Sequence, residues 1–344
     1  MNPLRVAVIG AGYWGPNLIR NLHEAPGSEP VAVADLSPER LEGIRKRFPA
    51  LRLTTDHRTL FADKTIDAVA IATPVTTHRR LVEEAFAAGK HVFVEKPLAA
   101  TSTDAEAMVR AAEKAGRTLM VGHTFVYNPA VVTVRGLIER GELGRVNYVD
   151  SQRVNLGLHQ FDINVLWDLG PHDVSISLYW LGEEPEWVQC VGACYVQPEA
   201  GIEDVVFLTM GFPSGALAHA HLSWLAPSKL RTMTVIGAKK MAVYDDMETV
   251  ERVKVYDFGV QELSGEELRR SYRAGDIHSP HVPITEALQI EMRHFIECVQ
   301  QGKKPRSDGE AGLRVVRVLE AGMRSLRSGG QRVSYRETPE VARA

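Results

Sequence analysis

Cysteine is scarce in this sequence, with only 3 residues among 344, namely Cys190, Cys194 and Cys298. This low usage favours a reducing compartment, so we expect a cytoplasmic protein without a disulfide framework. If Cys190 and Cys194 lie on one strand, their Cα atoms are about 13 Å apart, which is too far for a disulfide. Plain alternation along strands accounts for these cysteines and for His219 and His221, so we expect no metal site.

The sequence also lacks a block of one charge and a long apolar run. Lys and Arg total 40 and Asp and Glu total 43, which gives a net charge of −3. This balance argues against a nucleic-acid partner. No apolar run approaches the ~20 residues that span a bilayer, and the N-terminus enters the first predicted strand without a signal-peptide pattern, so we expect no membrane partner. The length allows two domains of ordinary size.

What the sequence does contain is a nucleotide-binding pattern between Arg5 and Asp35. An apolar run predicts a buried strand, three glycines follow in GxGxxG spacing, and a helical repeat leads to a second apolar run that ends in Asp35. Together these elements predict one βαβ unit that holds a dinucleotide. Gly10 permits the tight turn, Gly12 lets the pyrophosphate approach, and Gly15 lets helix and strand pack closely. The helix N-terminus then offers free N–H groups to the phosphates.

The acid at the end of the second strand indicates which nucleotide binds. Asp35 would accept both ribose hydroxyls and would repel a 2′-phosphate. No arginine directly follows it, although Arg40 could turn inward. We therefore expect NAD rather than NADP.

Two later strands of the first half end in residues of interest. The strand from 68 to 72 ends at Thr73-Pro74, and the strand from 91 to 94 ends in Glu95-Lys96-Pro97. Ligands in such folds bind at the carboxyl ends of the strands, so the charged pair falls where a ligand is expected, although a solvated turn is the alternative. His78 follows Thr73-Pro74 and is either a surface histidine in the first turn of a helix or a cofactor contact.

The pattern of elements changes near residue 124. Before it, strands alternate with helices, which predicts a doubly wound parallel sheet of the Rossmann type over residues 1–124. After it, many strands joined by short turns predict an α/β domain with an open, mainly antiparallel sheet over residues 125–344. We expect the first domain to bind NAD and the second to bind substrate and to self-associate. Val206, Leu208, Leu217 and Leu222 are predicted to form an apolar patch on an uncovered face of that sheet.

One segment of the second half pairs an acid with a histidine. Asp168 and His172 lie four residues apart, so one helical turn would align them on one face. Pro171 fits the first turn of a helix that begins there. The alternative is a core histidine satisfied by a neighbouring acid.

These residues match a known family. The chain resembles the Gfo/Idh/MocA oxidoreductases over essentially its whole length, with the markers GAGYWG at Gly10, AGKHVFVEKPLA at Ala88 to Ala99, and WDLGPHD at Trp167 to Asp173. The resemblance implies NAD(P)-dependent oxidation or reduction of a sugar or cyclitol carbon. It also implies self-association through the open sheet face, which suggests a homodimer or homotetramer.

The resemblance assigns roles to individual residues. By position, Lys96 matches the family's active-site lysine, and Asp168 and His172 match its second catalytic pair. The family often has another acid three residues after the histidine, where this chain has Ser175. Our expectation is that His172 takes the hydroxyl proton, Asp168 orients its ring, and Lys96 stabilises the negative charge that develops on the oxygen.

The two sets of binding residues follow from these patterns and from the resemblance. We expect the cofactor to contact Gly10, Gly12, Tyr13, Trp14, Gly15, Asp35, Thr73, Pro74, His78, Glu95 and Lys96. We expect the substrate to contact Lys96, His123, Asn128, Arg153, Asn155, Asp168, His172 and Arg231.

The substrate itself is predicted from a subgroup of the family. The segments from Arg153 to Asp173 and from His221 to Asp246 are most similar to members that oxidise C3 of UDP-N-acetylglucosamine or its uronic acid. Cations and amides would hold the diphosphate, with Lys229 as a further candidate, and Trp224 or Tyr195 would face the uracil. The alternatives are a free-sugar or inositol dehydrogenase, an enzyme that uses bound NAD for glycoside cleavage, and a non-catalytic NAD-binding regulator.

Overall fold

The protein forms two compact units in the computed structural model, which describes residues 2–157, 163–261 and 271–336. The first unit comprises Met1–Asn128 and Thr285–Val316, and the second comprises Pro129–Ile284 and Arg317–Ala344. The return of residues 285–316 to the first unit is a feature that the pattern of strands and helices does not predict. The division into NAD-binding and substrate-binding domains at residues 124 and 125 stays a functional prediction.

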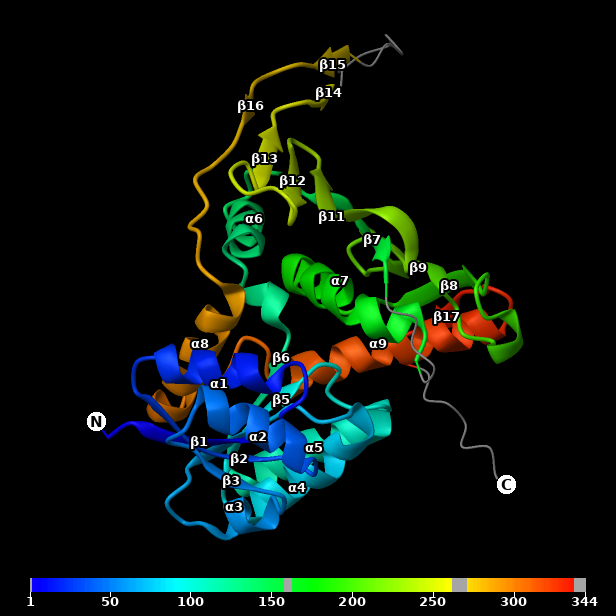
Figure 1. Cartoon of the computed structure of the whole chain (residues 1–344). Helices are drawn as coiled ribbons and strands as arrows, with labels where there is room; N and C mark the ends of the chain where they lie inside the picture. The colour runs from blue at the N-terminus through cyan, green and yellow to red at the C-terminus, as the bar shows by residue number, and fades with distance from the viewer. Residues whose placement is uncertain (1, 158–162, 262–270, 337–344) are drawn as a thin grey trace. The chain divides into compact units, whose positions relative to one another are not determined.

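The first unit is built on a six-stranded sheet in the order β3-β2-β1-β4-β5-β6, and every neighbouring pair is parallel (Figure 1). Its strands are β1 (Leu4–Ile9), β2 (Ser28–Ala34), β3 (Arg52–Thr54), β4 (Ala68–Ile71), β5 (His91–Glu95) and β6 (Leu119–Gly122). The side chains of β4 and β6 are all buried, which explains why these strands read as continuous apolar runs. The predicted parallel Rossmann sheet is confirmed.

Helices follow the strands of this sheet in alternation. They are α1 (Gly15–Glu24), α2 (Pro38–Arg47), α3 (Arg58–Ala62), α4 (His78–Ala87), α5 (Ser102–Ala115) and α8 (Ala287–Gln301), with the short turns η1 (Val75–Thr77) and η2 (Thr124–Tyr127). Helix α8 packs against α1, where Arg20 and Glu286 form an ion pair of 2.7 Å. Phe295 of α8 also meets Phe93 of β5 edge-on. These contacts place the late helix in the first unit, and nothing in the local pattern of residues 285–301 encodes them.

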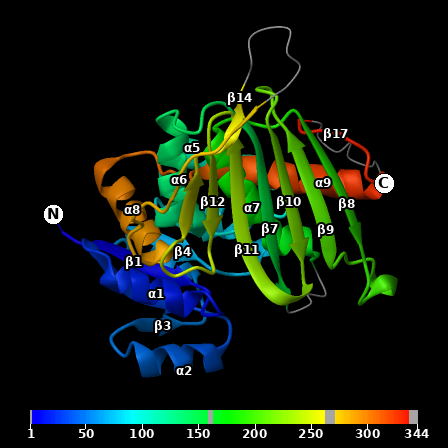
Figure 2. The ribbon, with the colours of Figure 1, turned by 90° about the horizontal axis from the view of Figure 1, so that it is seen from above.

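The second unit contains a nine-stranded sheet in the order β16-β13-β12-β11-β7-β10-β9-β8-β17 (Figure 2). Its strands are β7 (Val146–Leu156), β8 (Trp187–Ala193), β9 (Val205–Gly211), β10 (Leu217–Ser223), β11 (Leu225–Gly237), β12 (Met241–Asp245), β13 (Val253–Tyr256), β16 (Ile277–His278) and β17 (Val333–Ser334). Only β7 and β10 pair in parallel among these described strands. The prediction of a mainly antiparallel sheet is confirmed.

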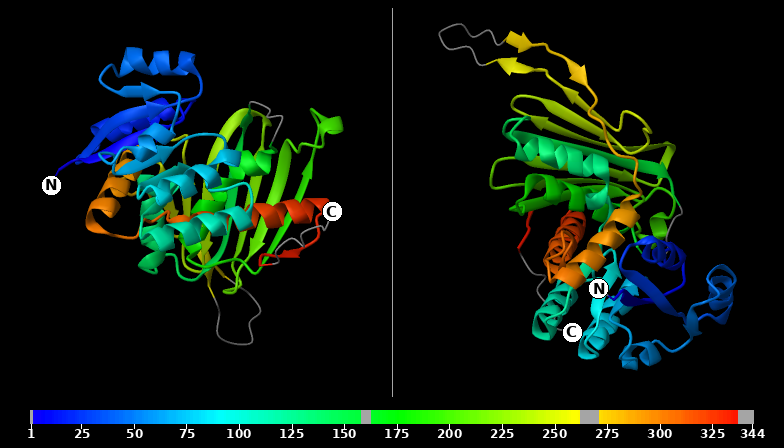
Figure 3. Two further views of the ribbon diagram at one scale, coloured as in Figure 1. Left: turned by 90° about the horizontal axis from the view of Figure 1, so that it is seen from below. Right: turned by 90° about the vertical axis from the view of Figure 1, so that its left-hand side faces the viewer.

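A separate two-stranded ribbon, β14 (Gly259–Gln261) with β15 (Ser271–Arg273), lies beyond the end of β13 (Figure 3). The remaining elements of the second unit are α6 (Pro129–Glu139), α7 (Val165–Leu181), the turn η3 (Pro198–Ala200) and the later part of α9 (Gly309–Arg327). None of the helices in the described part of the chain combines the length and apolar character needed to cross a bilayer.

The face of the second unit's sheet that we predicted to be uncovered is mostly the buried one. Val206, Leu208 and Leu222 are fully buried, and the exposed apolar residues of this region are Tyr148, Val191, Phe207 and Leu217. Strand side chains alternate with a period of two, so the prediction assigned three of its four residues to the wrong face. On the exposed face, Phe207 stacks on His221 with 4.5 Å between ring centroids. This face therefore carries aromatic and aliphatic side chains.

Helix α7 begins earlier than Pro171 suggested. It runs from Val165 to Leu181 with Pro171 inside it, and Asn164 caps its N-terminus by accepting the Trp167 N–H at 3.2 Å. The predicted start at Pro171 is wrong, because the helix already begins after the Asn164 cap and continues through the proline. Asp168 and His172 still lie in one helix with the expected spacing of one turn.

Candidate functional site

The glycine loop of the first unit has the geometry that a pyrophosphate requires. Gly10 has φ +101°, and a Cβ at this position would collide with the carbonyl of Ala72. A Cβ on Gly15 would collide with the Gly10 carbonyl, whereas a Cβ on Gly12 would meet no protein atom within 4 Å. Gly10 and Gly15 are thus fixed by the protein's own packing. The open space at Gly12 leaves room for a ligand at the start of α1, where the positive end of the helix dipole attracts phosphate.

A cavity of about 520 Å³ opens beside this loop. Its lining residues come from the glycine loop, from the segments that follow β2, β3 and β4, and from the starts of α2 and α4: Ile9, Gly10, Gly12, Ala34, Asp35, Leu36, Arg40, Thr55, His57, Ala72, Thr73, Pro74, Thr77, Arg80 and Leu81. The carboxyl ends of the central strands therefore enclose the cavity, as expected for a nucleotide site in this type of sheet.

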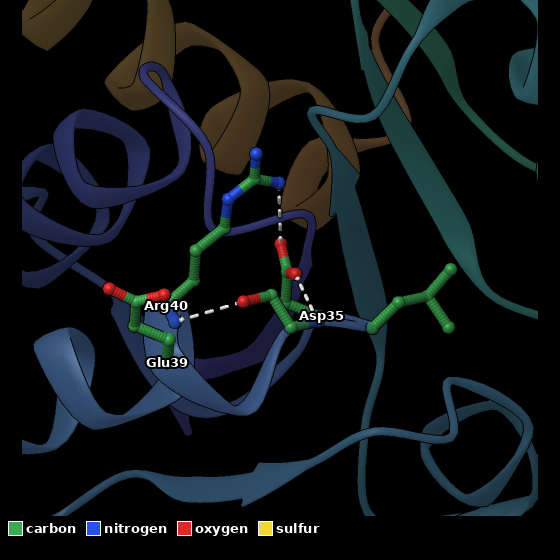
Figure 4. Close-up of a pocket in the computed structure, with 5 residues that line it drawn as sticks. Asp35, Glu39 and Arg40 are labelled. Carbon is green, nitrogen blue, oxygen red and sulfur yellow. Dashed lines mark hydrogen bonds and ion pairs between the residues drawn. The ribbon is translucent and has the colours of Figure 1, made fainter.

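Asp35 is held in place at the end of β2. Its Oδ2 accepts the Ala11 N–H at 2.6 Å and its Oδ1 accepts the Ser37 N–H at 2.8 Å. Arg40 directs its guanidinium toward the same carboxylate from 3.7 Å (Figure 4). Each carboxylate oxygen has a second acceptor position, so the carboxylate is able to receive ribose hydroxyls while it holds the loop.

The position of Asp35 predicts the choice of cofactor. NAD should bind better than NADP, because the carboxylate would repel the 2′-phosphate. In Asp35→Ser, the difference between the affinities for the two cofactors should be smaller. The dissociation constants of both cofactors, measured by titration calorimetry, test this prediction. Arg40→Ala serves as a comparison, because Arg40 is 60 % exposed and its guanidinium lies 3.7 Å from the carboxylate. Equal affinity of the wild-type protein for the two cofactors would contradict the assignment.

Lys96 follows β5 directly, at the same edge of the sheet as Thr73 and Pro74. The preceding Glu95 is 7 % exposed, and burial raises its pKa to about 7 while the charge of Lys96 opposes the shift. Gly122 on the neighbouring strand makes room for this carboxyl group, since a Cβ there would lie 3.0 Å from Glu95 Oε2. The Lys96–Pro97 peptide bond is cis. Glu95 is thus buried at the end of the strand, whereas Lys96 and Pro97 are half-buried in the bend that follows.

Two further buried titratable residues belong to this part of the first unit. His123 is 2 % exposed, and neither ring nitrogen has a hydrogen-bond partner in the described part of the chain. Burial and the nearby Lys96 lower its pKa to about 3, so its ring is neutral at pH 7. Glu291 of α8 accepts the Thr124 hydroxyl at 2.7 Å, and burial together with the charge of Glu95 raises its pKa well above the ordinary value. The carboxyl of Glu291 was not anticipated, because it reaches this region from a distant helix.

Burial of Glu95 should make stability depend on pH. Its folded-state pKa of about 7 exceeds the ordinary 4.5, so the stabilising contribution is complete below pH 4.5 and is lost as the pH rises through 7. Between pH 4.5 and 7, the free energy of unfolding of the wild type should fall by up to roughly 3 kcal/mol relative to that of Glu95→Gln. Urea denaturation at pH 5 and pH 8 measures this difference, with the exposed Glu42→Gln as a control. If the difference in the free energy of unfolding between Glu95→Gln and the wild type is the same at both pH values, burial does not shift the pKa of Glu95.

In the second unit, Asp168 has a partner that the sequence did not indicate. The Trp224 indole N–H donates to Asp168 Oδ2 at 3.0 Å. Trp224 is 1 % exposed, and Gly157 leaves space for its ring because a Cβ there would collide with the indole. The prediction that Trp224 offers a stacking face to uracil is therefore wrong, since a buried ring has no free face. Instead, Trp224 fixes one oxygen of the carboxylate next to His172.

Arg153 lies in the interior of the second unit. Its side chain is 3 % exposed and forms an ion pair with Asp173, which also accepts the Ser151 hydroxyl. A buried pair of this kind loses several kcal/mol if one partner is removed, so Arg153 has a structural role. Asp173 is engaged in the same pair, and the Ser175 hydroxyl donates to the His172 carbonyl at 2.8 Å. Arg153 therefore has little surface to offer a substrate.

Arg231 keeps a more accessible position. It lies 3.5 Å from Asp246, which also pairs with Arg252 at 3.2 Å and accepts the Tyr244 hydroxyl at 2.8 Å. Two guanidinium groups thus share one carboxylate. Arg252 was missed by the sequence reasoning, because its place beside Arg231 depends on the pairing of β12 with β11 and β13.

The other predicted site residues are distributed as follows. In the first unit, Tyr13 and Trp14 are 83 % and 40 % exposed beside the glycine loop, Asn128 is buried, and His78 is buried behind the cavity wall. The interpretation of His78 as a surface histidine is wrong. In the second unit, Asn155 on β7 is half-buried, whereas Tyr195 and Lys229 are exposed. Lys96, His123 and Asn128 belong to the first unit, and Asp168, His172, Asn155 and Arg231 belong to the second.

The residues of the first unit fit a nicotinamide dinucleotide. The open space at Gly12 and the start of α1 suit the pyrophosphate, and Asp35 suits a ribose. When bound, NAD supplies the acceptor for a hydride, and the chain supplies position and charge.

Comparison with known proteins agrees with this geometry. Residues 4–123 match the model described as "Oxidoreductase family, NAD-binding Rossmann fold", and residues 131–243 match the GFO/IDH/MocA C-terminal domain. The D-apiose dehydrogenase of Paraburkholderia graminis is 29% identical over 94% of this chain and 88% of its own length. The myo-inositol 2-dehydrogenase of Thermotoga maritima is 26% identical over 94% of this chain and 96% of its own length.

Two solved structures extend the comparison. A putative oxidoreductase from Magnetospirillum magnetotacticum MS-1 is 32% identical, with a TM-score of 0.79 over 93% of this chain and 99% of its own. The UDP-N-acetylglucosamine 3-dehydrogenase GnnA from Acidithiobacillus ferrooxidans shares the fold, with 24% identity and a TM-score of 0.80 over 96% and 99% of the two chains. The parallel sheet with its glycine loop, the mixed second sheet and these matches lead to one conclusion: the chain belongs to the Gfo/Idh/MocA family of NAD-binding oxidoreductases and is a dehydrogenase of CH–OH groups.

Proposed function

We propose that this enzyme oxidises a secondary alcohol of a sugar or polyol, with Lys96, Asp168 and His172 as its catalytic residues. The observation that carries the proposal is the placement of Lys96 directly after β5, at the strand edge where Thr73 and Pro74 line the nucleotide cavity. The second unit adds an acid and a histidine one helical turn apart on α7, with the acid oriented by Trp224.

The proposed chemistry assigns one task to each residue. As the alcohol loses a hydride to NAD, its hydroxyl proton must also leave, and the imidazole of His172 accepts that proton. The ammonium of Lys96 donates a hydrogen bond to the same oxygen and stabilises the negative charge that develops on it. Asp168 stabilises the imidazolium that results. In the reverse direction, His172 returns the proton to the oxygen.

For the substrate, our first candidate is C3 of a UDP-linked N-acetyl hexose or its uronic acid. The support that remains is the positive charge of Arg231 and Arg252 around Asp246, together with the exposed Lys229 and Tyr195. Arg153 and Trp224 no longer contribute, because both are buried against internal partners. The shared fold of the UDP-N-acetylglucosamine 3-dehydrogenase is compatible with this candidate but carries no evidence on substrate.

The second candidate is a free sugar or a cyclitol. It is favoured by the names of relatives at 26–29% identity, which act on D-apiose and on myo-inositol. It is also favoured by the loss of one contact that was predicted for the diphosphate, Arg153, and one that was predicted for the uracil, Trp224. The two candidates differ in charge, so they make opposite predictions about inhibition.

A panel of UDP-sugars, free sugars and cyclitols with NAD, followed at 340 nm, decides between them. For a nucleotide sugar, UDP should compete with the substrate, and Arg231→Ala should raise its inhibition constant about tenfold or more, as expected for a lost charge-assisted hydrogen bond. Rapid oxidation of inositol or a free sugar without inhibition by millimolar UDP would establish the second candidate. No turnover with any alcohol, despite NAD binding, would point to a regulator instead. Release of a glycoside's leaving group would identify the cleavage reaction.

We also propose that the protein self-associates, as a dimer or tetramer, through the exposed face of the nine-stranded sheet. Tyr148, Val191, Phe207 and Leu217 give this face its apolar character. Phe207→Arg should shift the mass measured by light scattering toward that of one chain, because a charge replaces a central apolar contact. Tyr272→Arg, on the separate ribbon, serves as the control. A wild-type protein that is monomeric at micromolar concentration would contradict the proposal. A cytoplasmic location stays a prediction.

A further inference from the structure

One buried histidine of the first unit connects two segments that the proposed function uses separately. His78 is the first residue of α4 and is 1 % exposed. Its Nε2 lies 2.9 Å from the Thr73 carbonyl oxygen. Its Nδ1 lies 3.1 Å from the Pro97 carbonyl oxygen and 3.2 Å from that of Leu98. Both edges of the ring therefore face backbone acceptors.

These acceptors belong to the two important strand ends. Thr73 and the following Pro74 line the nucleotide cavity after β4, and Thr73 is also fixed by a 2.7 Å contact between its hydroxyl and that of Thr77. Pro97 and Leu98 directly follow Lys96 after β5. The ring of His78 thus bridges the wall of the cavity and the segment that carries the lysine, 19 residues further along the chain from itself.

The chemistry of imidazole suits this task. A carbonyl oxygen only accepts hydrogen bonds, so the ring must donate to it. Neutral histidine donates from one nitrogen, and the imidazolium donates from both, on opposite edges of one rigid ring. Burial lowers the pKa of His78 by more than the three carbonyl contacts raise it, so at neutral pH the ring donates a hydrogen bond to one of the two segments and contacts the other. A side chain that only filled this volume would hold neither segment.

We propose that His78 is a positioning residue, which sets the place of Lys96 relative to the nucleotide cavity without touching cofactor or substrate itself. The proposal rests on the proposed role of Lys96. Because misplacement of a catalytic group by about 1 Å costs on the order of 10²-fold in rate, a loosened Lys96 segment should be visible in kcat.

Substitutions test this role in the full-length enzyme. His78→Leu removes every donor, and we expect kcat to fall about 10- to 100-fold while KM for the alcohol changes only a few-fold. His78→Asn keeps one donating group, and we expect it to recover part of the loss. The control is His91→Leu, since His91 is a half-buried histidine at the amino end of β5 whose ring contacts Thr118 and Arg117. His91→Leu should leave kcat unchanged.

A double-mutant cycle separates positioning from general damage. If His78 acts through Lys96, His78→Leu should have no further effect on kcat in a Lys96→Ala background. Equal losses in both backgrounds, or a His78→Leu enzyme with wild-type kcat, would overturn the proposal. If His78→Leu does not fold, His78→Asn is used in the same cycle.

Amide hydrogen exchange gives a readout that does not depend on turnover. The amides of Leu98 and Ala99 should exchange faster in His78→Leu than in the wild type, and not in His91→Leu. Unchanged exchange would refute the proposed bridge. Faster exchange in an enzyme that oxidises no alcohol would support the bridge and refute the proposed function, so the two failures are distinguishable.

Discussion

Replacing Lys96 by alanine should lower kcat/KM by about 10²-fold or more while NAD still binds. The ammonium is expected to stabilise charge that develops on the reacting oxygen, and groups of this kind typically contribute that much to the rate. A 10²-fold loss corresponds to about 2.7 kcal/mol of transition-state stabilisation. Initial rates at 340 nm give kcat/KM, and titration calorimetry gives the affinity for NAD.

Two variants make the Lys96 experiment specific. Lys114→Ala removes an exposed lysine from the last turn of α5 and should have no effect. Lys96→Arg keeps the charge but changes the donor geometry, so it should retain only part of the activity. If Lys96→Ala stays within a few-fold of the wild type in kcat/KM, the lysine takes no part in the chemistry.

Replacing His172 by asparagine should lower kcat about 10²- to 10⁴-fold, because the proton acceptor is lost. The pH dependence should change as well. The wild-type rate should fall at acidic pH, where an imidazole is already protonated, and the residual rate of His172→Asn should lack that limb. Asp168→Asn leaves an oxygen for the Trp224 indole but removes the charge beside the imidazole, so we expect a smaller loss.

The matched control for this prediction is His281→Asn. His281 is an exposed histidine of the same unit, and its substitution should change neither kcat nor the pH dependence of kcat. A His172→Asn enzyme that retains the wild-type pH profile would assign the proton to another base. Asp168 and His172 would then be a structural pair of the core, as the spacing alone allowed.

The sequence by itself determined those features that depend on neighbouring residues. The βαβ unit from Arg5 to Asp35, the parallel sheet of the first unit and the glycine positions are all predictable, because apolar period, turn residues and helix starts are local properties. The spacing of Asp168 and His172 likewise fixes their relative position once a helix forms. The residues Glu95 to Pro97 could be placed at the carboxyl edge of the sheet because they end a buried strand.

Only the tertiary structure decided which side of an element is covered and which partners meet across the chain. A period of two does not say which face helices will cover, so Val206, Leu208 and Leu222 were assigned to the exposed face although they are buried. Arg153 and Trp224 look like substrate contacts as isolated residues. Their roles changed because Asp173 and Asp168 reach them from α7.

The same reason explains the features that no pattern predicted. His78 bridges Thr73 and Pro97, Glu291 reaches the region of Glu95 from a late helix, and residues 285–316 return to the first unit. Each depends on contacts between segments that are not adjacent along the chain, and their free energy comes from burial and hydrogen bonds that exist only after the strands are in register. Local sequence therefore set the type and order of the elements, and long-range packing set what each side chain does.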